Sequence, residues 1–280
     1  MTTLTAEEAA PVTKRKVAKR SLASRMSWWQ PLVVFLIIIG IWYGVAYYYD
    51  KVQELGFLVP YPHLVFESLF LDAERRPALL TALGNTTQIM LSGLGIAIVI
   101  GMLWAIIMSQ AKWAERSLFP YAVILQCIPI LALVPLIGSL FGYESASRII
   151  VTTMISLFPL VSNTLFGLQS ADRAQRELFK LQGASRWTVL TKLQFPAALP
   201  LIFVGLRNAA GLSVIGAIVG DQFFQRGQGG LGVLIQLYNS RLQGSDTFAT
   251  IIAASILGVV VFLVFGLLGR LAIGKWYDFN

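Results

Sequence analysis

Six stretches of the chain are apolar almost throughout, and short polar segments separate them. Each stretch is about as long as the roughly 20 residues that a helix needs to cross the hydrocarbon core of a membrane. Apolar residues make up 56% of the 280 residues and charged residues only 13%, whereas soluble domains average about 25% charged residues. The sequence therefore predicts an all-α polytopic membrane protein with six transmembrane helices and no separate soluble domain. The six stretches are residues 29–48, 88–108, 118–140, 149–168, 201–219 and 248–268.

The positively charged residues are distributed unevenly between the segments that join these stretches. Cytoplasmic loops of membrane proteins carry an excess of Lys and Arg. If the N-terminus, residues 109–117, residues 169–200 and the residues from Arg270 onward are cytoplasmic, they hold 15 of the 22 Lys and Arg, and the outer segments hold six. We therefore expect both termini in the cytoplasm, with residues 1–27 as a basic tail and residues 28–280 as the membrane domain. The net charge of +8 follows from this topology, so we infer no nucleic-acid partner.

Few residues of the chain are suited to catalysis or metal binding. His63 is the only histidine and Cys127 the only cysteine, and the six stretches contain no Asp, Glu or His. We therefore expect no catalytic and no metal site. Gly227, Gly229 and Gly232 have the spacing of a dinucleotide-binding loop, but no strand precedes them. We interpret these glycines as a tight turn before a helix over residues 233–242.

The third stretch contains two prolines, Pro129 and Pro135, which should break its helix. Backbone groups that are freed at membrane depth are tolerated where they face protein or a water-lined cavity. The break therefore indicates either a pathway-lining segment or a structural kink, and the sequence leaves both open.

Polar residues within the later stretches are further candidates for a transport pathway. Ser162 and Asn163 predict hydrogen bonds between helices. Arg207 follows Pro200 by about two helical turns, so its side chain can extend to the cytoplasmic interface. The candidate pathway-lining residues are Gln126, Pro129, Leu131, Pro135, Ser162, Asn163, Arg207, Ser213 and Asp221.

The polar segment between the fourth and fifth stretches has the signals of two short helices. Asp172 with Gln175 predicts a capped helix from Arg173 to Gln182, and Gly183 suits the left-handed position that ends a helix. A second helix is expected from Ser185 to Gln194, before Pro196, with Pro200 opening the next stretch. Such an element can dock on a soluble partner or lie on the membrane as a connector, and local signals do not decide between them.

This segment resembles the EAA motif of binding-protein-dependent ABC transporter permeases, Glu-Ala-Ala-x3-Gly-x9-Ile-x-Leu-Pro. Glu177, Gly183 and Pro196 stand at the family positions with the spacing kept. Leu178 and Phe179 replace the two alanines, and Leu193 and Phe195 replace the aliphatic residues. The similarity extends from Val59 to the last stretch and is greatest to the nitrate, sulfonate and taurine branch.

The resemblance implies a MetI-like type I importer core in a bacterial inner membrane. It implies three kinds of partner: a second permease subunit, cytoplasmic ATPases that bind ATP and Mg²⁺, and an extracytoplasmic substrate-binding protein. This chain has no phosphate-binding loop of its own, so no cofactor is expected in it. The substrate would be a small anion of the nitrate, sulfonate or taurine type or a heterocyclic vitamin precursor. The residues expected to couple to the ATPase are Glu177, Leu178, Phe179, Gly183, Ala184, Ser185 and Pro196.

Two other classes remain as alternatives, a membrane-embedded enzyme and a secondary transporter. An intramembrane hydrolase needs a catalytic pair at depth, which the six stretches lack. An ion-coupled carrier usually has an intramembrane carboxylate or broken helices in two repeats, and the chain has one broken stretch and no evident repeat.

Overall fold

A computed structural model of the chain describes residues 29–274, so the predicted basic tail and the last six residues lie outside the described part. All regular structure in this part is helical. The elements are α1 (Trp29–Lys51), α2 (Pro62–Phe70), α3 (Arg76–Ser109), α4 (Lys112–Cys127), α5 (Ile130–Phe141), α6 (Ser145–Gln169), α7 (Arg173–Leu181), α8 (Arg186–Val189), the π-helical turn η2 (Leu190–Gln194), α9 (Phe195–Phe223), α10 (Leu231–Ser240) and α11 (Gly244–Ile273).

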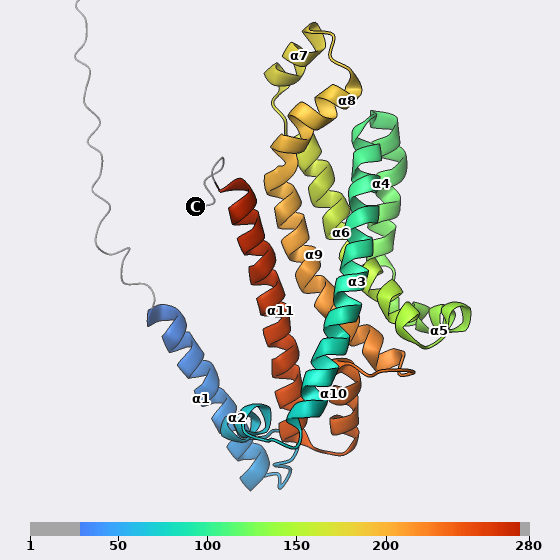
Figure 1. The fold of residues 1–280 in the computed structure, drawn as a ribbon. Coiled ribbons are helices and arrows are strands. Elements are labelled where there is room, and N and C mark those ends of the chain that lie inside the picture. The colour runs from blue at the N-terminus through green and yellow to red at the C-terminus, as the bar shows by residue number, and fades with distance from the viewer. Residues whose placement is uncertain (1–28, 275–280) are drawn as a thin grey trace, which may run out of the picture.

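The centre of the bundle is the pair α6 and α9, flanked by α3 and α11 (Figure 1). Small residues let these backbones approach closely. A Cβ atom at Gly216 of α9 would lie 2.8 Å from the Cα of Thr152 in α6, and one at Gly167 of α6 would lie 3.0 Å from Ala198. Lipid tails are as apolar as the side chains of these helices, so moving a side chain from lipid to a helix contact gains little hydrophobic free energy. Close packing of the backbones therefore holds the helices together.

The helices alternate in direction between two ends of the molecule. Figure 1 places α7 and α8 at one end and α2 and α10 at the other. The start of α1 and the end of α11 point toward the end that carries α7 and α8. The described residues therefore agree with the expected even number of crossings, with both ends of the helical region on the side of the 172–196 segment.

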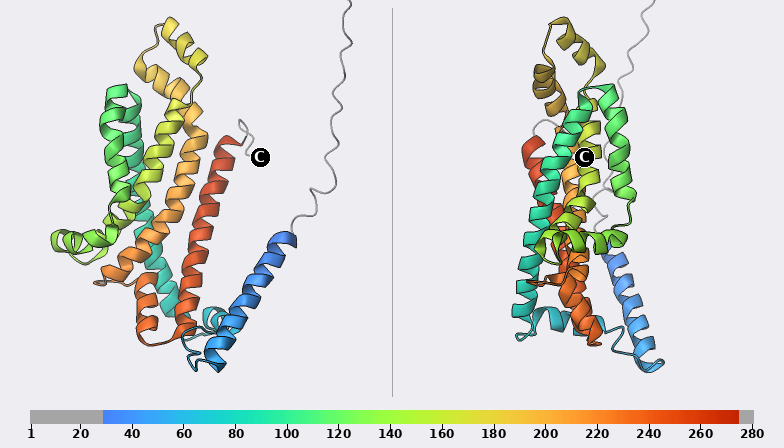
Figure 2. Two further views of the ribbon diagram at one scale, coloured as in Figure 1. Left: turned by 180° about the vertical axis from the view of Figure 1, so that it is seen from behind. Right: turned by 90° about the vertical axis from the view of Figure 1, so that its right-hand side faces the viewer.

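Five helices are long and apolar enough to cross a membrane, and α4 with α5 forms a sixth crossing only if the bent pair counts as one. The expected break of the third stretch occurs at Pro129, whereas the break expected at Pro135 does not occur. The axes of α4 and α5 differ by 95°, and α5 projects sideways from the bundle (Figure 2). Pro129 causes the break, because it forces Ile128 into an extended conformation and itself starts α5, whereas Pro135 sits inside α5 without ending it.

Candidate functional site

The segment between α6 and α9 forms two helices that meet at Gly183, as the sequence predicts. The carboxylate of Asp172 accepts a hydrogen bond from the Ala174 amide (3.3 Å) and caps α7. At the other end, Gly183 has φ of +68° and its amide bonds to Lys180, while the Ala184 amide bonds to Phe179 (3.0 Å). These two bonds form a Schellman motif.

The second helix of this segment begins at its own cap. The Ser185 hydroxyl accepts from the Thr188 amide at 3.1 Å and caps α8. The expected capping bond from Gln175 is absent from the described residues, so the Asp172 side chain alone caps the first helix.

Large apolar side chains of this segment face outward. Leu178 is 53% exposed, Leu181 86% and Trp187 71%, and α7 has no buried residue. Figure 1 shows α7 and α8 standing clear of the bundle. Trp187 is absent from the sequence-predicted set, although an aromatic residue in the first turn after the Ser185 cap is a recognisable signal. Exposed apolar groups on a charged helix pair are typical of a protein-binding surface.

The remaining predicted residues of the segment lie around this surface. Glu177, Gly183 and Ser185 are exposed, whereas Phe179, Ala184 and Pro196 are half-buried. Glu177 pairs with Arg173 at 3.1 Å in an exposed position, which contributes little to stability.

Arg176 fixes the base of α7 to the bundle. Its guanidinium donates to the carbonyls of Leu168 and Gln169 at the end of α6. Helix ends leave such carbonyls without partners inside the helix, and a cation is favoured there. A cleft of about 350 Å³ lies beside it, and its lining includes Arg176, Lys180 and Arg186.

The expected end of the second helix before Pro196 is wrong. The helical backbone continues without a break from Arg186 to Phe223, and Pro196 and Pro200 both lie within it. The turn before Pro196 is widened to a π-helix, in which the Phe195 amide bonds to the Leu190 carbonyl. This widening accommodates a proline ring that would otherwise clash with the carbonyl four residues earlier.

The predicted pathway-lining residues fall into distinct environments. Around the α4–α5 break, Gln126, Pro129, Leu131 and Pro135 are all exposed in the single chain. Because their side chains lie on the surface of the chain, a pathway here requires another subunit or a partner to enclose it.

Three predicted polar residues of α6 and α9 form hydrogen bonds within their own helices. Ser162 donates to the Phe158 carbonyl, Asn163 to the Pro159 carbonyl and Ser213 to the Ala210 carbonyl. The expected hydrogen bonds between helices at Ser162 and Asn163 are therefore wrong. Ser213 is fully buried and Ser162 nearly so, because hydroxyls bonded to the preceding turn can be packed without a partner on a neighbouring helix.

The side chain of Arg207 packs against α11. Its guanidinium carbon lies 3.7 Å from the centre of the Phe262 ring of α11, in a cation–π contact. A Cβ atom at Gly266 would lie 3.5 Å from the Arg207 Nε, so the missing side chain leaves room for the guanidinium. Among the described residues, the Nε is buried without an acceptor and no carboxylate pairs with Arg207.

The most buried polar cluster of the described residues joins Arg148 and Asp221. Arg148 Nη1 lies 3.1 Å from Asp221 Oδ1, and the two side chains are 1% and 0% exposed. The guanidinium also donates to the carbonyls of Phe224, Arg226 and Gln228, and the Thr86 hydroxyl donates to Asp221 at 3.0 Å. The cluster therefore ties α3, α6 and α9 to the loop 224–230. Asp221 does not face an open pathway, contrary to its place in the predicted set.

Glycines allow the loop 224–230 to close over this cluster. A side chain at Gly230 would collide with the Asp221 carboxylate and the Thr86 hydroxyl, and one at Gly220 would lie 3.1 Å from the Arg148 backbone. Gly227 has φ of +88°. The helix that follows is Leu231–Ser240, two residues earlier than expected. Gly227 and Gly229 thus lie in an irregular loop that leads into a helix, and Gly232 lies within that helix.

These features define a membrane-embedded helical transport subunit with a capped helix pair projecting from one end. Comparison with known proteins makes the class specific. Residues 97–274 match the model of the family described as "Binding-protein-dependent transport system inner membrane component", and the chain belongs to this family. It is a permease of an ATP-driven importer and not an enzyme, and family membership removes the secondary-transporter and membrane-enzyme alternatives.

Individual relatives are similar over most of the chain. The formylaminopyrimidine transport permease protein of Halalkalibacterium halodurans is 33% identical over 83% of this chain and 90% of its own length. The riboflavin transport system permease protein of Chloroflexus aurantiacus is 32% identical over 60% of this chain and 62% of its own. A putative aliphatic sulfonates transport permease protein of Bacillus subtilis is 27% identical over 86% of each chain.

Proposed function

We propose that this permease couples to its ATPase through the helix pair α7–Gly183–α8. The observation that carries the proposal is the exposed apolar surface of Leu178, Leu181 and Trp187 on two helices that are individually capped and held at a fixed angle. A preformed surface of this kind loses little conformational entropy on binding. Glu177, Phe179, Gly183, Ala184, Ser185 and Pro196 complete the coupling segment.

The orientation follows from this role. The 172–196 segment faces the cytoplasm, where two ATPase subunits bind ATP and Mg²⁺. Both termini then lie on the same side, and the loop 224–230 with α10 faces outward toward an extracytoplasmic substrate-binding protein. The excess of Lys and Arg in the 169–200 segment supports this orientation. The chain crosses the bacterial cytoplasmic membrane as a multi-pass protein.

A second permease subunit completes the pathway. The exposed residues around the α4–α5 break, Gln126, Pro129, Leu131 and Pro135, are the candidates for lining it. Interrupted helices at membrane depth occur where the backbone faces protein or a cavity, which supports an interface at this break. Asn163 remains a secondary candidate, since it is half-buried, whereas the Arg207 side chain packs against Phe262 of α11.

The substrate is a small anion of the nitrate, sulfonate or taurine type or a heterocyclic vitamin precursor. The relatives named for formylaminopyrimidine and riboflavin transport favour the heterocycle, and the relative named for sulfonate transport favours the anion. Ligand binding by the partner binding protein distinguishes these two classes directly.

The coupling role is tested with two exposed tryptophans. Trp187 lies on α8 and is 71% exposed, and Trp113 is 73% exposed at the start of α4, at the same end of the molecule but outside the projecting pair. We expect Trp187→Ala to reduce co-purification of the ATPase at least about tenfold, because aromatic anchors dominate protein interfaces. Trp113→Ala should leave co-purification at the wild-type level. Equal effects of the two changes would contradict the proposal.

A further inference from the structure

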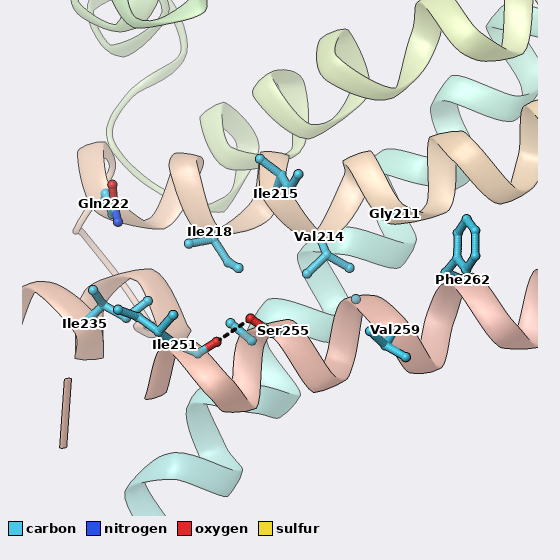
Figure 3. Close-up of a pocket in the computed structure, with 12 residues that line it drawn as sticks. Gly211, Val214, Ile215, Ile218, Gln222, Ile235, Ile251, Ser255, Val259 and Phe262 are labelled. Carbon is cyan, nitrogen blue, oxygen red and sulfur yellow. Dashed lines mark hydrogen bonds between the residues drawn. The ribbon is translucent and has the colours of Figure 1, made fainter. Parts of the chain in front are cut away.

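An apolar groove runs between α9 and α11, apart from the coupling segment and the Arg148 cluster. It has a volume of about 620 Å³. Figure 3 shows side chains from both helices facing into it, with Gln222 and Ile235 at one end and Phe262 at the other. The hydroxyl of Ser255 is already bonded to the Ile251 carbonyl (2.9 Å). The lining of the groove is therefore mostly apolar along its length, and a hydrocarbon chain is the kind of ligand that suits it.

The groove opens to the outside of the bundle. Ile215 of α9 is 53% exposed, and Ile251 and Val259 of α11 are 42% and 57% exposed. Gly211 and Gly258 have no side chains to fill the groove, and a Cβ atom at Gly211 would meet no atom within 4 Å. An elongated apolar molecule can enter the groove sideways from the membrane.

A single positive charge stands at one end of this apolar surface. Arg207 lies one helical turn from Gly211 and stacks on Phe262, which itself lines the groove. No described residue accepts a hydrogen bond from its guanidinium or forms a salt bridge with it within 4.0 Å. An unpaired charge within a membrane-spanning helix is costly, and an anion that accepts its hydrogen bonds removes that cost.

The position of Arg207 along the helices matches the boundary of the hydrocarbon. The 30 residues of α11 span about 45 Å, about 15 Å more than the roughly 30 Å core, so each end extends beyond the core. Gly266, which faces Arg207, lies about 10 Å from the end of α11 at Ile273. The guanidinium is thus only a few ångström inside the boundary, on the side of α7 and α8.

The groove extends from this charge toward the middle of the membrane. From Arg207 to Gln222 the distance along α9 is about 22 Å, more than the roughly 15 Å of one leaflet. A negative headgroup at one end and an acyl chain pointing inward is the arrangement of a phospholipid in that leaflet. Arg207 therefore lies where the phosphate of such a lipid would be, and the apolar groove lies where its acyl chain would be.

We propose that the α9–α11 groove binds an anionic phospholipid of the cytoplasmic leaflet, with its phosphate on Arg207 and one acyl chain along the groove. The assignment to the cytoplasmic leaflet rests on the orientation proposed above. The site lies on α9, the helix that continues into α8, so a bound lipid contacts the same element that meets the ATPase.

The test uses the full importer complex in nanodiscs, with bound lipid measured by native mass spectrometry. Phosphatidylglycerol is the probe, and phosphatidylcholine is the comparison lipid. We expect Arg207→Gln to weaken phosphatidylglycerol binding at least about tenfold, the loss expected when a charge-assisted contact is removed. Arg207→Lys keeps the charge and should retain part of the binding. Arg270→Gln is the matched control, because it removes an exposed arginine near the end of α11, and it should change binding less than twofold.

A second pair of variants tests the acyl-chain half of the site. The Cβ atom of Gly211→Leu would meet no atom within 4 Å, so the side chain can occupy the groove and should also weaken phosphatidylglycerol binding, whereas Gly95→Leu, at an equally open position on α3, should not. Equal binding of the two lipids to the wild-type complex, or equal effects of Arg207→Gln and Arg270→Gln, would overturn the lipid site. Loss of the second permease subunit in Gly211→Leu alone would assign the groove to subunit contact instead. Co-purification of the ATPase, measured in every variant, reports on the proposed function independently.

Discussion

Arg148 at the start of α6 and Asp221 near the end of α9 form an ion pair of 3.1 Å that is almost completely removed from the surface. The arginine also binds three carbonyls of the segment that follows α9. Burial of two charges costs free energy that their attraction repays only when further hydrogen bonds are present. Here those hydrogen bonds come from the loop, so the conformation of the loop and the pairing of the two charges depend on each other.

Removal of one member of this pair should destabilise the permease strongly. We expect Arg148→Gln or Asp221→Asn to lower the free energy of unfolding by about 3–5 kcal/mol, because a buried charge is left uncompensated. The double variant should lose less than the sum of the single losses. Thermal melting of the detergent-purified protein measures the changes. Arg173→Gln, which breaks an exposed pair, serves as the control and should cost below about 1 kcal/mol. Additive losses in the double variant would contradict the coupling.

Closure of the loop over the pair should depend on the absence of a side chain at Gly230. The Cβ atom of Gly230→Ala would collide with the Asp221 carboxylate and the Thr86 hydroxyl. We expect a loss of about 1–3 kcal/mol, as for overpacking of a buried site. Limited proteolysis within residues 224–230 should become faster. Gly95→Ala, at an open position, should leave both measurements unchanged, and resistance of Gly230→Ala to the protease would show that the loop can rearrange freely.

The angle between α7 and α8 should depend on the left-handed conformation of Gly183. Gly183→Val forces a β-branched side chain into φ of +68° and should cost about 1–2 kcal/mol locally. We expect ATPase stimulation in reconstituted vesicles to fall, because the two helices no longer meet at the docking angle. Gly142→Val is the control: its φ is +84° and its surroundings are equally open, but it lies after α5. It should leave ATPase stimulation intact. Full ATPase stimulation in Gly183→Val would show that coupling does not depend on the angle between α7 and α8.

The π-helical turn should set the direction in which α8 faces. Deletion of the exposed Thr191 removes one residue from this turn and should rotate α8 by about 100° relative to α9. Trp187 would then point away from the proposed docking face, and co-purification of the ATPase should be lost. The melting temperature should change little, since α7 and α8 contribute few buried residues. Deletion of the exposed Gln225, in the loop on the opposite side, tests whether any shortening has this effect on ATPase binding.

The parts of the fold that could be predicted from the sequence are those set by local chemistry. The caps at Asp172 and Ser185 and the left-handed Gly183 depend on neighbouring residues alone, and all three occur as expected. The locations of the apolar helices follow from their length and composition. Local signals also gave the position of the break at Pro129, but not its angle of 95°, which depends on the packing of α5 against α6.

The parts that were missed depend on contacts between distant residues. Arg148 and Asp221 are 73 positions apart, and both stand at the ends of apolar stretches, where a charge normally indicates exposure to water. Pro196 was expected to end a helix because the sequence does not show that the preceding turn can widen. The contact of Arg207 with Phe262, in the space left by Gly266 on α11, is visible only in the folded bundle.

The uninterrupted helical backbone from Arg186 to Phe223 has a mechanical consequence. Its 38 residues would span about 57 Å as a straight helix, from the proposed ATPase contact to the loop that Arg148 holds on the other side. No loop interrupts this backbone, and the π-helical turn, at which α8 bends away from α9 (Figure 1), is the only change of hydrogen-bond register. A tilt of about 5° would displace the far end by roughly 5 Å over this length. The helix therefore resembles a stiff lever. A movement of α8 would be transmitted along α9 and would displace the loop 224–230 on the opposite side of the membrane.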